Sequence, residues 1–135
     1  MPQRIAVTGG ATDLAEARAI AEAFAAANGL PSGERARLQI VLDELISNLA
    51  RHGYAPGVAG FAEIGLCRDG DLMVLDFVDG GAAFDPVQAP PPELDAPAAQ
   101  RPVGGLGLQL VRALADKLTY ERRGNENHLQ FIRRL

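Results

Sequence analysis

Two strand patterns joined by a short turn set the first requirement on the fold. Residues 61–67 and 72–78 both have the composition of strands, and Arg68-Asp69-Gly70-Asp71 lies between them. An Asp-Gly turn between two strands predicts a β-hairpin, so the two strands should be antiparallel neighbours. The second strand is apolar on both faces apart from Asp76, which indicates an interior position in a sheet.

Two helical patterns precede this hairpin. In the first, apolar residues recur at helical spacing from Leu14 to Phe24. Thr12 or Asp13 is the candidate cap at its start, and Asn28-Gly29 should end it. The second helix should have Ser32 as its N-cap and should end at Gly53. One stripe of its surface is apolar and should face a core; this stripe comprises Leu38, Val41, Leu42, Leu45 and Leu49.

The rest of the chain completes an order that separates helices from strands. A short strand is expected at 4–8, and a third helix from Leu106 to Lys117 with Leu110, Val111 and Leu114 facing inward. A last strand pair is expected at 118–123 and 128–134. The order strand, two helices, two strands, long loop, helix, two strands predicts an α+β two-layer sandwich. Its sheet should be mixed but mostly antiparallel, with helices covering one face.

Composition narrows the class of protein. With 135 residues, of which 47% are hydrophobic, the chain can form a single domain over residues 1–135 with one core. The formal net charge of −4 argues against a nucleic-acid binder, which usually has a basic surface. Cys67 is the only cysteine, and no apolar run has the length of a membrane span. With no signal-peptide pattern at the N-terminus, these features favour a cytoplasmic protein without membrane contact.

The first of three candidate clusters lies on the second helix. Glu44 and Asn48 are four residues apart, so they share one helix face, beside the apolar stripe. A glutamate can act as a base, and an amide oxygen suits a hard cation such as Mg²⁺. Taken alone, the pair is more often an ordinary polar helix edge.

The second cluster directly follows the apolar strand 72–78. Asp79 could accept a hydrogen bond from an amino group, and Gly81 would let a flat ring approach the backbone. This combination suits an adenine, although an isolated Asp-Gly pair is more often a simple turn.

The third cluster, Gly104-Gly105-Leu106-Gly107-Leu108, precedes a helix, where exposed amide groups favour an anion such as a triphosphate. It matches neither a Walker P-loop nor a Rossmann fingerprint. Between the second and third clusters, residues 85–104 include Pro90-Pro91-Pro92, and a connection of this length is typical of a lid or binding loop.

Together, the three clusters resemble the N, G1 and G2 boxes of the GHKL ATPase superfamily, which includes histidine kinases and gyrase-like ATPases. Their residue patterns are most similar to those of the small anti-sigma-factor serine kinases. The resemblance rests on Glu44-Leu45-x-x-Asn48-x-x-x-His52-x-Tyr54, on Asp79-x-Gly81-x-x-Phe84-Asp85-Pro86, on Gly104-Gly105-Leu106-Gly107-Leu108 and on the terminal Asn127-x-Leu129.

The resemblance implies a Bergerat-type ATP-binding fold and a set of roles. Asn48 would hold Mg²⁺ that bridges the ATP phosphates, and Glu44 would be the catalytic base. Asp79 would contact the adenine amino group with Gly81 beside it. Four residues of the third cluster would line the phosphates at the end of the lid, namely Gly105, Leu106, Gly107 and Leu108. His52 and Tyr54 match the motif but are expected to be structural.

The resemblance also implies a function. The chain would transfer the γ-phosphoryl group of ATP to a serine or threonine of an antagonist protein and so control a sigma factor by partner switching, often as a homodimer. Three other hypotheses are a nucleotide-binding module without kinase activity, the ATP-binding part of a sensor histidine kinase, and a scaffold that has lost the nucleotide. The presence of all three clusters makes the scaffold the weakest of them.

Overall fold

The computed structural model describes residues 2–86 and 105–135. In chain order, its elements are β1 (Gln3–Val7), α1 (Ala11–Ala27), α2 (Ser32–Asn48), the π-helical turn η1 (Leu49–Gly53), β2 (Gly60–Asp69), β3 (Leu72–Asp79), α3 (Gly105–Leu114), β4 (Lys117–Arg123) and β5 (Glu126–Arg134). This is the predicted order of elements. Within the described residues, no helix combines the length and the apolar character needed to span a bilayer.

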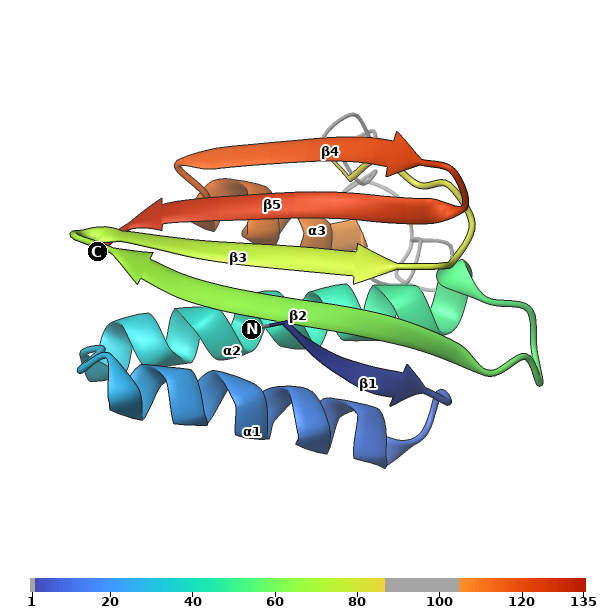
Figure 1. Cartoon of the computed structure of the whole chain (residues 1–135), viewed down its shortest axis with the longest axis horizontal. Helices are drawn as coiled ribbons and strands as arrows, with labels where there is room; N and C mark the ends of the chain where they lie inside the picture. Colours follow the sequence, from blue (N-terminus) through green and yellow to red (C-terminus); the bar gives the residue numbers. More distant parts are fainter. Residues whose placement is uncertain (1, 87–104) are drawn as a thin grey trace.

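The five strands form one sheet in the order β1-β2-β3-β5-β4 (Figure 1). All four pairings between these described strands are antiparallel, so the sheet is antiparallel rather than mixed. β3 occupies the middle of the sheet, as its apolar sequence predicted. Gly70 closes the β2–β3 hairpin with φ of 61°, a left-handed conformation that glycine adopts without steric cost.

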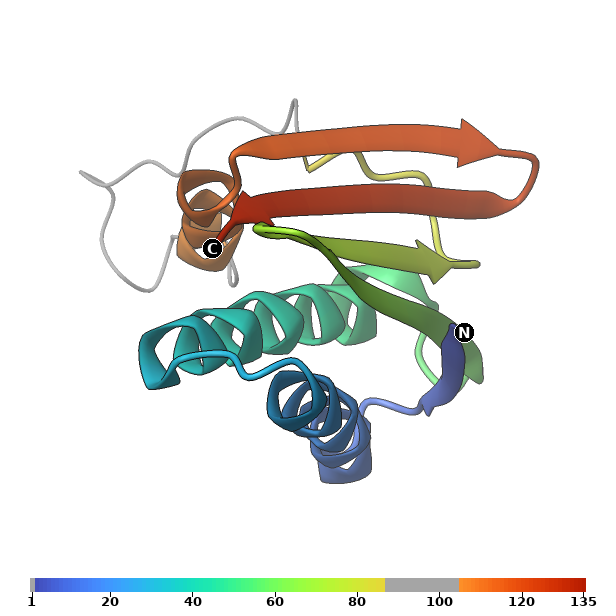
Figure 2. The ribbon, with the colours of Figure 1, turned by 60° about the vertical axis from the view of Figure 1, so that its left-hand side comes forward.

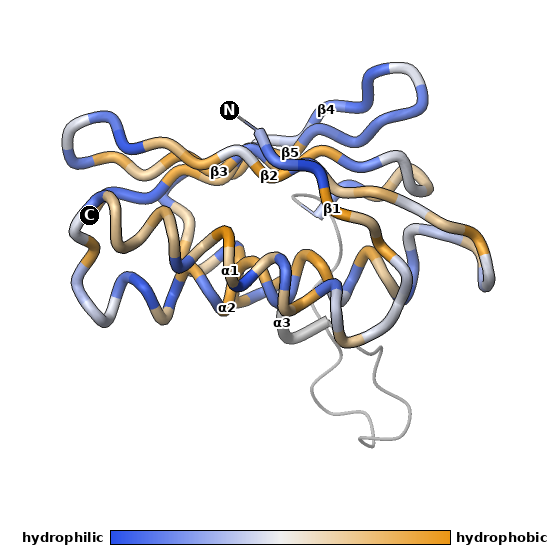
Figure 3. Tube along the Cα trace, turned by 60° about the horizontal axis from the view of Figure 1, so that its bottom comes forward, coloured by the Kyte–Doolittle hydropathy of each residue, from blue (hydrophilic) through white to orange (hydrophobic). Residues whose placement is uncertain are grey.

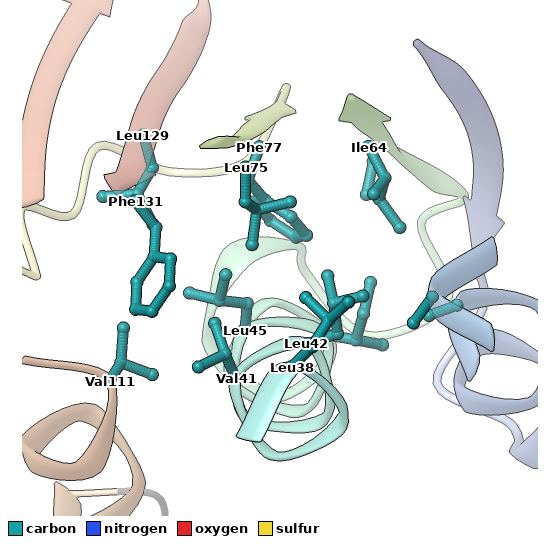
Figure 4. Packing of buried hydrophobic residues seen from close by; sticks show 14 of the residues in the cluster. Leu38, Val41, Leu42, Leu45, Ile64, Leu75, Phe77, Val111, Leu129 and Phe131 are labelled. Atoms are coloured by element: carbon teal, nitrogen blue, oxygen red, sulfur yellow. The ribbon is translucent and has the colours of Figure 1, made fainter. Parts of the chain in front are cut away.

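The helices cover one face of the sheet, and the two layers enclose the core (Figure 2). Hydrophobic residues recur along the strands and the helices of both layers (Figure 3). The predicted stripe of α2 is buried against inward-facing residues of the sheet and of α3, among them Ile64, Leu75, Phe77, Val111, Leu129 and Phe131 (Figure 4). The predicted α+β two-layer sandwich is confirmed.

The start of α1 differs from the prediction. Gly10 is the N-cap, without a side-chain hydrogen bond, and Asp13 lies inside the helix. The carboxylate of Asp13 instead accepts hydrogen bonds from the backbone N–H groups of Thr8 and Gly9 and from the Thr8 hydroxyl. Asp13 therefore fixes the connection between β1 and α1, because its side chain finds donors in the preceding turn rather than in its own helix.

Two other helix boundaries also differ. Pro31, not Ser32, is the N-cap of α2, because its extended backbone directly precedes the first helical residue. α3 ends at Leu114, and Lys117 already belongs to β4. Leu110 was expected to face inward but is 48% exposed; Leu108 and Val111 carry the buried face of α3.

Candidate functional site

A cavity lies where the C-terminal part of α2, η1, the end of β3, α3 and the β4–β5 hairpin meet. Its walls are mostly apolar, with a few polar groups, as is typical of small-molecule sites. The lining residues in the described part of the chain are Leu45, Asn48, Leu49, His52, Gly53, Phe77, Asp79, Ala82, Phe84, Pro86, Leu108, Tyr120, Asn127 and Leu129. Members of all three predicted clusters therefore meet in one cavity: Asn48, Asp79 and Leu108.

The cavity wall on the α2 side is shaped by a change of helix type. Regular α-helix ends at Asn48, and Leu49–Gly53 continues as a single π-helical turn. Such turns are rare and frequently accompany functional sites. Asn48 and His52 both line the cavity. Glu44 lies one helical turn before Asn48, is half-buried and is outside the cavity lining.

Gly81 has a structural role in addition to the predicted one of admitting a flat ring, which stays a prediction. A Cβ atom at this position would lie 2.8 Å from the carbonyl oxygen of Gly53, closer than such atoms approach in proteins. The backbone N–H of the next residue, Ala82, donates a 2.7 Å hydrogen bond to the same Gly53 oxygen. The space left by the missing side chain is thus filled by the backbone of η1, which joins the loop after β3 to the end of the α2 segment.

Asp79 is 7% exposed and lines the cavity. Its Oδ1 accepts hydrogen bonds from the backbone N–H of Gly81 at 2.8 Å and from the Asn127 side-chain amide at 2.9 Å. Burial raises the pKa of the Asp79 carboxyl, while these two hydrogen bonds and the positive charge of Arg122 oppose that rise. Within the described residues, no hydrogen bond reaches Oδ2, so this oxygen can accept one from a ligand.

Asp79, Asn127 and Arg122 form one row across the sheet. The register pairs Asp79 of β3 with Asn127 of β5, and Asn127 with Arg122 of β4. Asn127 is 6% exposed, and its Oδ1 accepts hydrogen bonds from the Tyr120 hydroxyl at 2.6 Å and from Arg122 at 3.0 Å. Its amide nitrogen also donates to the carbonyl oxygen of Ala82. The carboxylate is thus supported from two neighbouring strands.

Tyr54 holds the opposite side of the loop. Its hydroxyl donates to the carbonyl oxygen of Phe61 and accepts from the backbone N–H groups of Phe61 and Gly80. This agrees with the expectation that Tyr54 is a packed structural aromatic. The loop that follows Asp79 is consequently attached to η1, to β2 and to the β4–β5 hairpin.

The third cluster falls partly on α3. Gly105, Leu106 and Gly107 form the start of this helix, and Leu108 is buried against the cavity. Gly104 and residues 87–103 of the predicted lid lie outside the described residues. After β3, the carbonyl oxygen of Pro86 accepts a 2.7 Å hydrogen bond from Arg112 of α3. The C-terminal turn of α3 and the segment after β3 are therefore held close together.

Sequence reasoning singled out Asn127 only as part of a family-like pattern, and it missed Tyr120 and Arg122. Asn127 lies 48 residues after Asp79 in the chain. Its partnership with Asp79 depends on β3 and β5 being neighbours, although α3 and β4 separate them in sequence. Strand periodicity could have indicated that Tyr120 and Arg122 share a face, but not what that face meets.

Comparisons with known proteins agree with this geometry. The family described as "Histidine kinase-like ATPase domain" matches residues 8–133. The chain is similar to "Serine/threonine-protein kinase BtrW" of Bordetella bronchiseptica, with 35% identity over 95 residues that cover 70% of this chain and 67% of the relative.

Two solved structures share the fold. One is of the RsbU and RsbW domains of Rv1364c from Mycobacterium tuberculosis, with a TM-score of 0.64 and 18% identity; the match covers all of this chain but only 32% of that protein. The other is the histidine kinase domain of the blue-light activated histidine kinase EL346 from Erythrobacter litoralis, with a TM-score of 0.58 and 17% identity, covering 90% of this chain and 60% of that one. The chain belongs to the family of histidine kinase-like ATPase domains, as its three motifs predicted.

Proposed function

We propose that this chain is an ATP-dependent serine/threonine kinase of the anti-sigma-factor type. It would phosphorylate an antagonist protein on serine or threonine and regulate a sigma factor by partner switching. The observation that carries the proposal is the meeting of Asn48 and Asp79, from two different elements, in one largely apolar cavity. The similarity to a protein named as a serine/threonine kinase supports the same activity.

Adenine is the base that this cavity suits. The Oδ2 atom of Asp79 can accept a hydrogen bond from the adenine amino group, while Oδ1 is held by protein donors. Apolar side chains such as Leu49, Phe77 and Leu129 provide surface for a flat ring. Gly81 acts here indirectly, by allowing the loop to lie against η1.

The residues near the cavity also fit Mg²⁺. The amide oxygen of Asn48 is a hard ligand, and Mg²⁺ usually keeps several waters and takes only one or two ligands from the protein besides the phosphates. When bound, the ion would neutralise charge on the phosphates. Gly105, Leu106, Gly107 and Leu108 would lie along the phosphates, because the start of a helix offers unpaired N–H groups to an anion.

Glu44 is the proposed catalytic base. It makes no hydrogen bond or ion pair with any described residue, so its carboxylate can accept a proton. The acceptor hydroxyl would lose its proton to Glu44 as its oxygen attacks the γ-phosphorus. The bond between that phosphorus and the β–γ bridging oxygen breaks, and ADP leaves. The new phosphate would weaken antagonist docking by adding negative charge.

The remaining partners belong to the same proposal. The kinase would bind a sigma factor when the antagonist is phosphorylated, would act in the cytoplasm as a homodimer, and would contact neither nucleic acid nor membrane. The single-domain organisation over residues 1–135, with a lid at about 85–104, stays a prediction.

The first test measures MgATP binding by isothermal titration calorimetry. Asn48→Ala should weaken the Mg²⁺-dependent part of ATP affinity about tenfold, as expected for one lost polar ligand. Asn125→Ala, in the exposed β4–β5 turn, is the matched control and should bind like the wild type. Absence of ATP binding by folded wild-type protein would refute the kinase.

The second test separates catalysis from binding. Glu44→Gln should keep MgATP affinity within about twofold but lower transfer of label from γ-labelled ATP to protein serine or threonine in native cell extract about 100-fold or more. Glu16→Gln, on the exposed side of α1, is its control.

A nucleotide-binding module without kinase activity is the second candidate function. It is favoured by one observation: Glu44 lies outside the cavity lining that contains Asn48 and Asp79. Such a module would bind MgATP with the same residues and use it to gate a protein partner. MgATP binding by the wild type, with phosphoryl transfer no greater than in the extract alone, would favour it over the kinase.

A further inference from the structure

The row Asp79–Asn127–Arg122 determines more than the shape of the cavity. We propose that Asn127, oriented by Arg122, is a positioning residue that fixes Asp79 as a hydrogen-bond acceptor and thereby selects purines with a 6-amino group over those with a 6-oxo group. This proposal rests on the proposed nucleotide site and assigns the residues that set its base specificity.

The orientation of the Asn127 amide follows from its partners. A side-chain amide can be turned either way, so its oxygen and nitrogen must be assigned from neighbouring groups. The Tyr120 hydroxyl can donate or accept and does not decide the matter. The Arg122 guanidinium can only donate, and it lies 3.0 Å from the side of the amide that faces β4. That side must therefore carry the oxygen, and the NH₂ group must face Asp79.

The same guanidinium nitrogen reinforces the arrangement. It donates to the carbonyl oxygen of Gly81 at 2.8 Å as well as to Asn127. The Asn127 NH₂ group in turn donates to Asp79 and to the carbonyl oxygen of Ala82 at 2.9 Å. The loop and the carboxylate are thus held by one chain of donors with a single direction, from Arg122 to Asn127 to Asp79.

This direction has a consequence for the ligand. Two donors, from Asn127 and Gly81, occupy Oδ1 and favour the charged carboxylate, so Oδ2 remains an acceptor. A 6-amino group donates and satisfies it. A 6-oxo group would bring two acceptors together in a buried place, which is a repulsive element of specificity.

The decisive experiment is a double-mutant cycle on binding of MgATP and of magnesium inosine triphosphate, which differ at the 6-position of the purine. Asn127→Ala should lower ATP affinity about 10- to 100-fold, since a hydrogen bond to a charged group is lost, and should reduce the preference for ATP over inosine triphosphate. In the Asp79→Asn background, the same change should have almost no further effect, because Asn127 acts through Asp79.

Arg122→Met provides a second variant that leaves the buried residues in place. It should lower ATP affinity about 3- to 10-fold and reduce the same preference, because the Asn127 oxygen loses its charged donor and the amide is held less firmly. Arg123→Met is the matched control: Arg123 is adjacent in β4, but it pairs with Glu121 at 2.9 Å and should bind both nucleotides like the wild type. Circular dichroism and thermal unfolding establish that each variant is folded.

A pH profile adds a measurement that a purely structural role would not change. Without the amide donor, the pKa of Asp79 rises further. On acidification, ATP affinity should therefore begin to fall at a pH about one unit higher in Asn127→Ala than in the wild type. The charged and titratable groups that act on the site, Arg122, His128 and His52, are present in both proteins, so their contributions cancel in the difference.

The outcomes separate this proposal from the proposed function. Wild-type protein that binds no ATP overturns both. Wild-type protein that binds ATP and is weakened by Asp79→Asn, while Asn127→Ala and Arg122→Met keep the affinity, preference and pH profile of the wild type, overturns the positioning role alone. Additive losses in the double mutant also overturn it.

Discussion

Two carboxylates that lie near opposite ends of α2 are held by different kinds of hydrogen-bond donor. Asp79 lies beside the C-terminal end of α2, held by a neutral amide and a backbone N–H group, and burial raises its pKa. Glu34 lies in the first turn of α2, at the other end of this helix, where two arginines hold it. Arg133 lowers the pKa of Glu34.

The difference indicates what each carboxylate does. Arg133 donates to both oxygens of Glu34 and also to the carbonyl oxygen of Leu114, so it joins α2, β5 and the end of α3. Glu34 is satisfied by charge and supports the fold. Asp79 accepts its hydrogen bonds from neutral donors, and one of its oxygens stays available. A buried carboxylate that has no direct ion pair is suited to bind a ligand.

Replacing each carboxylate separately by its amide should produce the largest contrast, in ATP affinity and in the free energy of unfolding. Asp79→Asn should weaken MgATP about 100-fold, because the acceptor is lost, while its free energy of unfolding changes by less than about 1 kcal/mol. Glu34→Gln should leave ATP affinity within about twofold but lower the free energy of unfolding by about 1–2 kcal/mol, between the values for exposed and buried ion pairs. Calorimetry and urea unfolding measure the two quantities. Equal effects of both variants on ATP affinity would contradict the division of roles.

Two glycine-to-alanine variants test how the loop after β3 is attached to η1. Gly81→Ala should cost about 1–3 kcal/mol in the free energy of unfolding and weaken ATP binding, because the added methyl meets the backbone of Gly53 at 2.8 Å. Gly65→Ala, in β2, meets its nearest neighbour, the Cβ of Asp76, at 3.7 Å and should change neither quantity measurably. If Gly81→Ala proves as stable as Gly65→Ala, the close approach is not required.

The two carboxylates should contribute to the pH dependence of stability with opposite signs. This is the smallest of the expected effects. The pKa of Glu34 is lowered, so its contribution to stability is present above about 4.3, the ordinary glutamate value, and is lost as pH falls through its folded-state pKa. The pKa of Asp79 is raised, so the folded state binds its proton first, and stability falls as pH rises from about 3.9 through that pKa.

Urea unfolding between about pH 3 and pH 7 measures these contributions as differences from the wild type. Glu34→Gln should flatten the acid loss of stability, whereas Asp79→Asn should steepen it. If both variants changed the acid loss of stability in the same direction, the proposed contrast between the two carboxylates would be refuted.

Local patterns predicted most of the fold and the place of the motifs along it. The periodic stripe from Leu38 to Leu49 identified the buried face of α2, although the stripe did not include Ile46, which is also buried. The Asp-Gly turn at Gly70 identified the central hairpin. These features could be predicted because helix and strand periodicity and turn geometry depend on residues only a few positions apart.

The same local reasoning was less accurate at helix ends. It assigned Asp13 and Ser32 as helix N-caps and placed Leu110 on the buried face of the third helix. Asp13 finds its partners in the turn after β1, and Ser32 follows the actual cap. Several polar residues near a helix start satisfy the same local pattern, and the tertiary surroundings select among them.

At the site, the motifs identified Asn48 and Asp79 from the sequence, and the cavity brings both together. The sequence did not indicate that Gly81 lies against Gly53, that Asn127 donates to Asp79, or that Arg122 orients Asn127. These contacts join residues that are 28 and 48 positions apart, or lie on an edge strand whose neighbour is fixed only by the sheet order. A linear pattern records what a residue can donate or accept, but its partner is chosen by the register of non-consecutive strands, which forms only when the whole core packs.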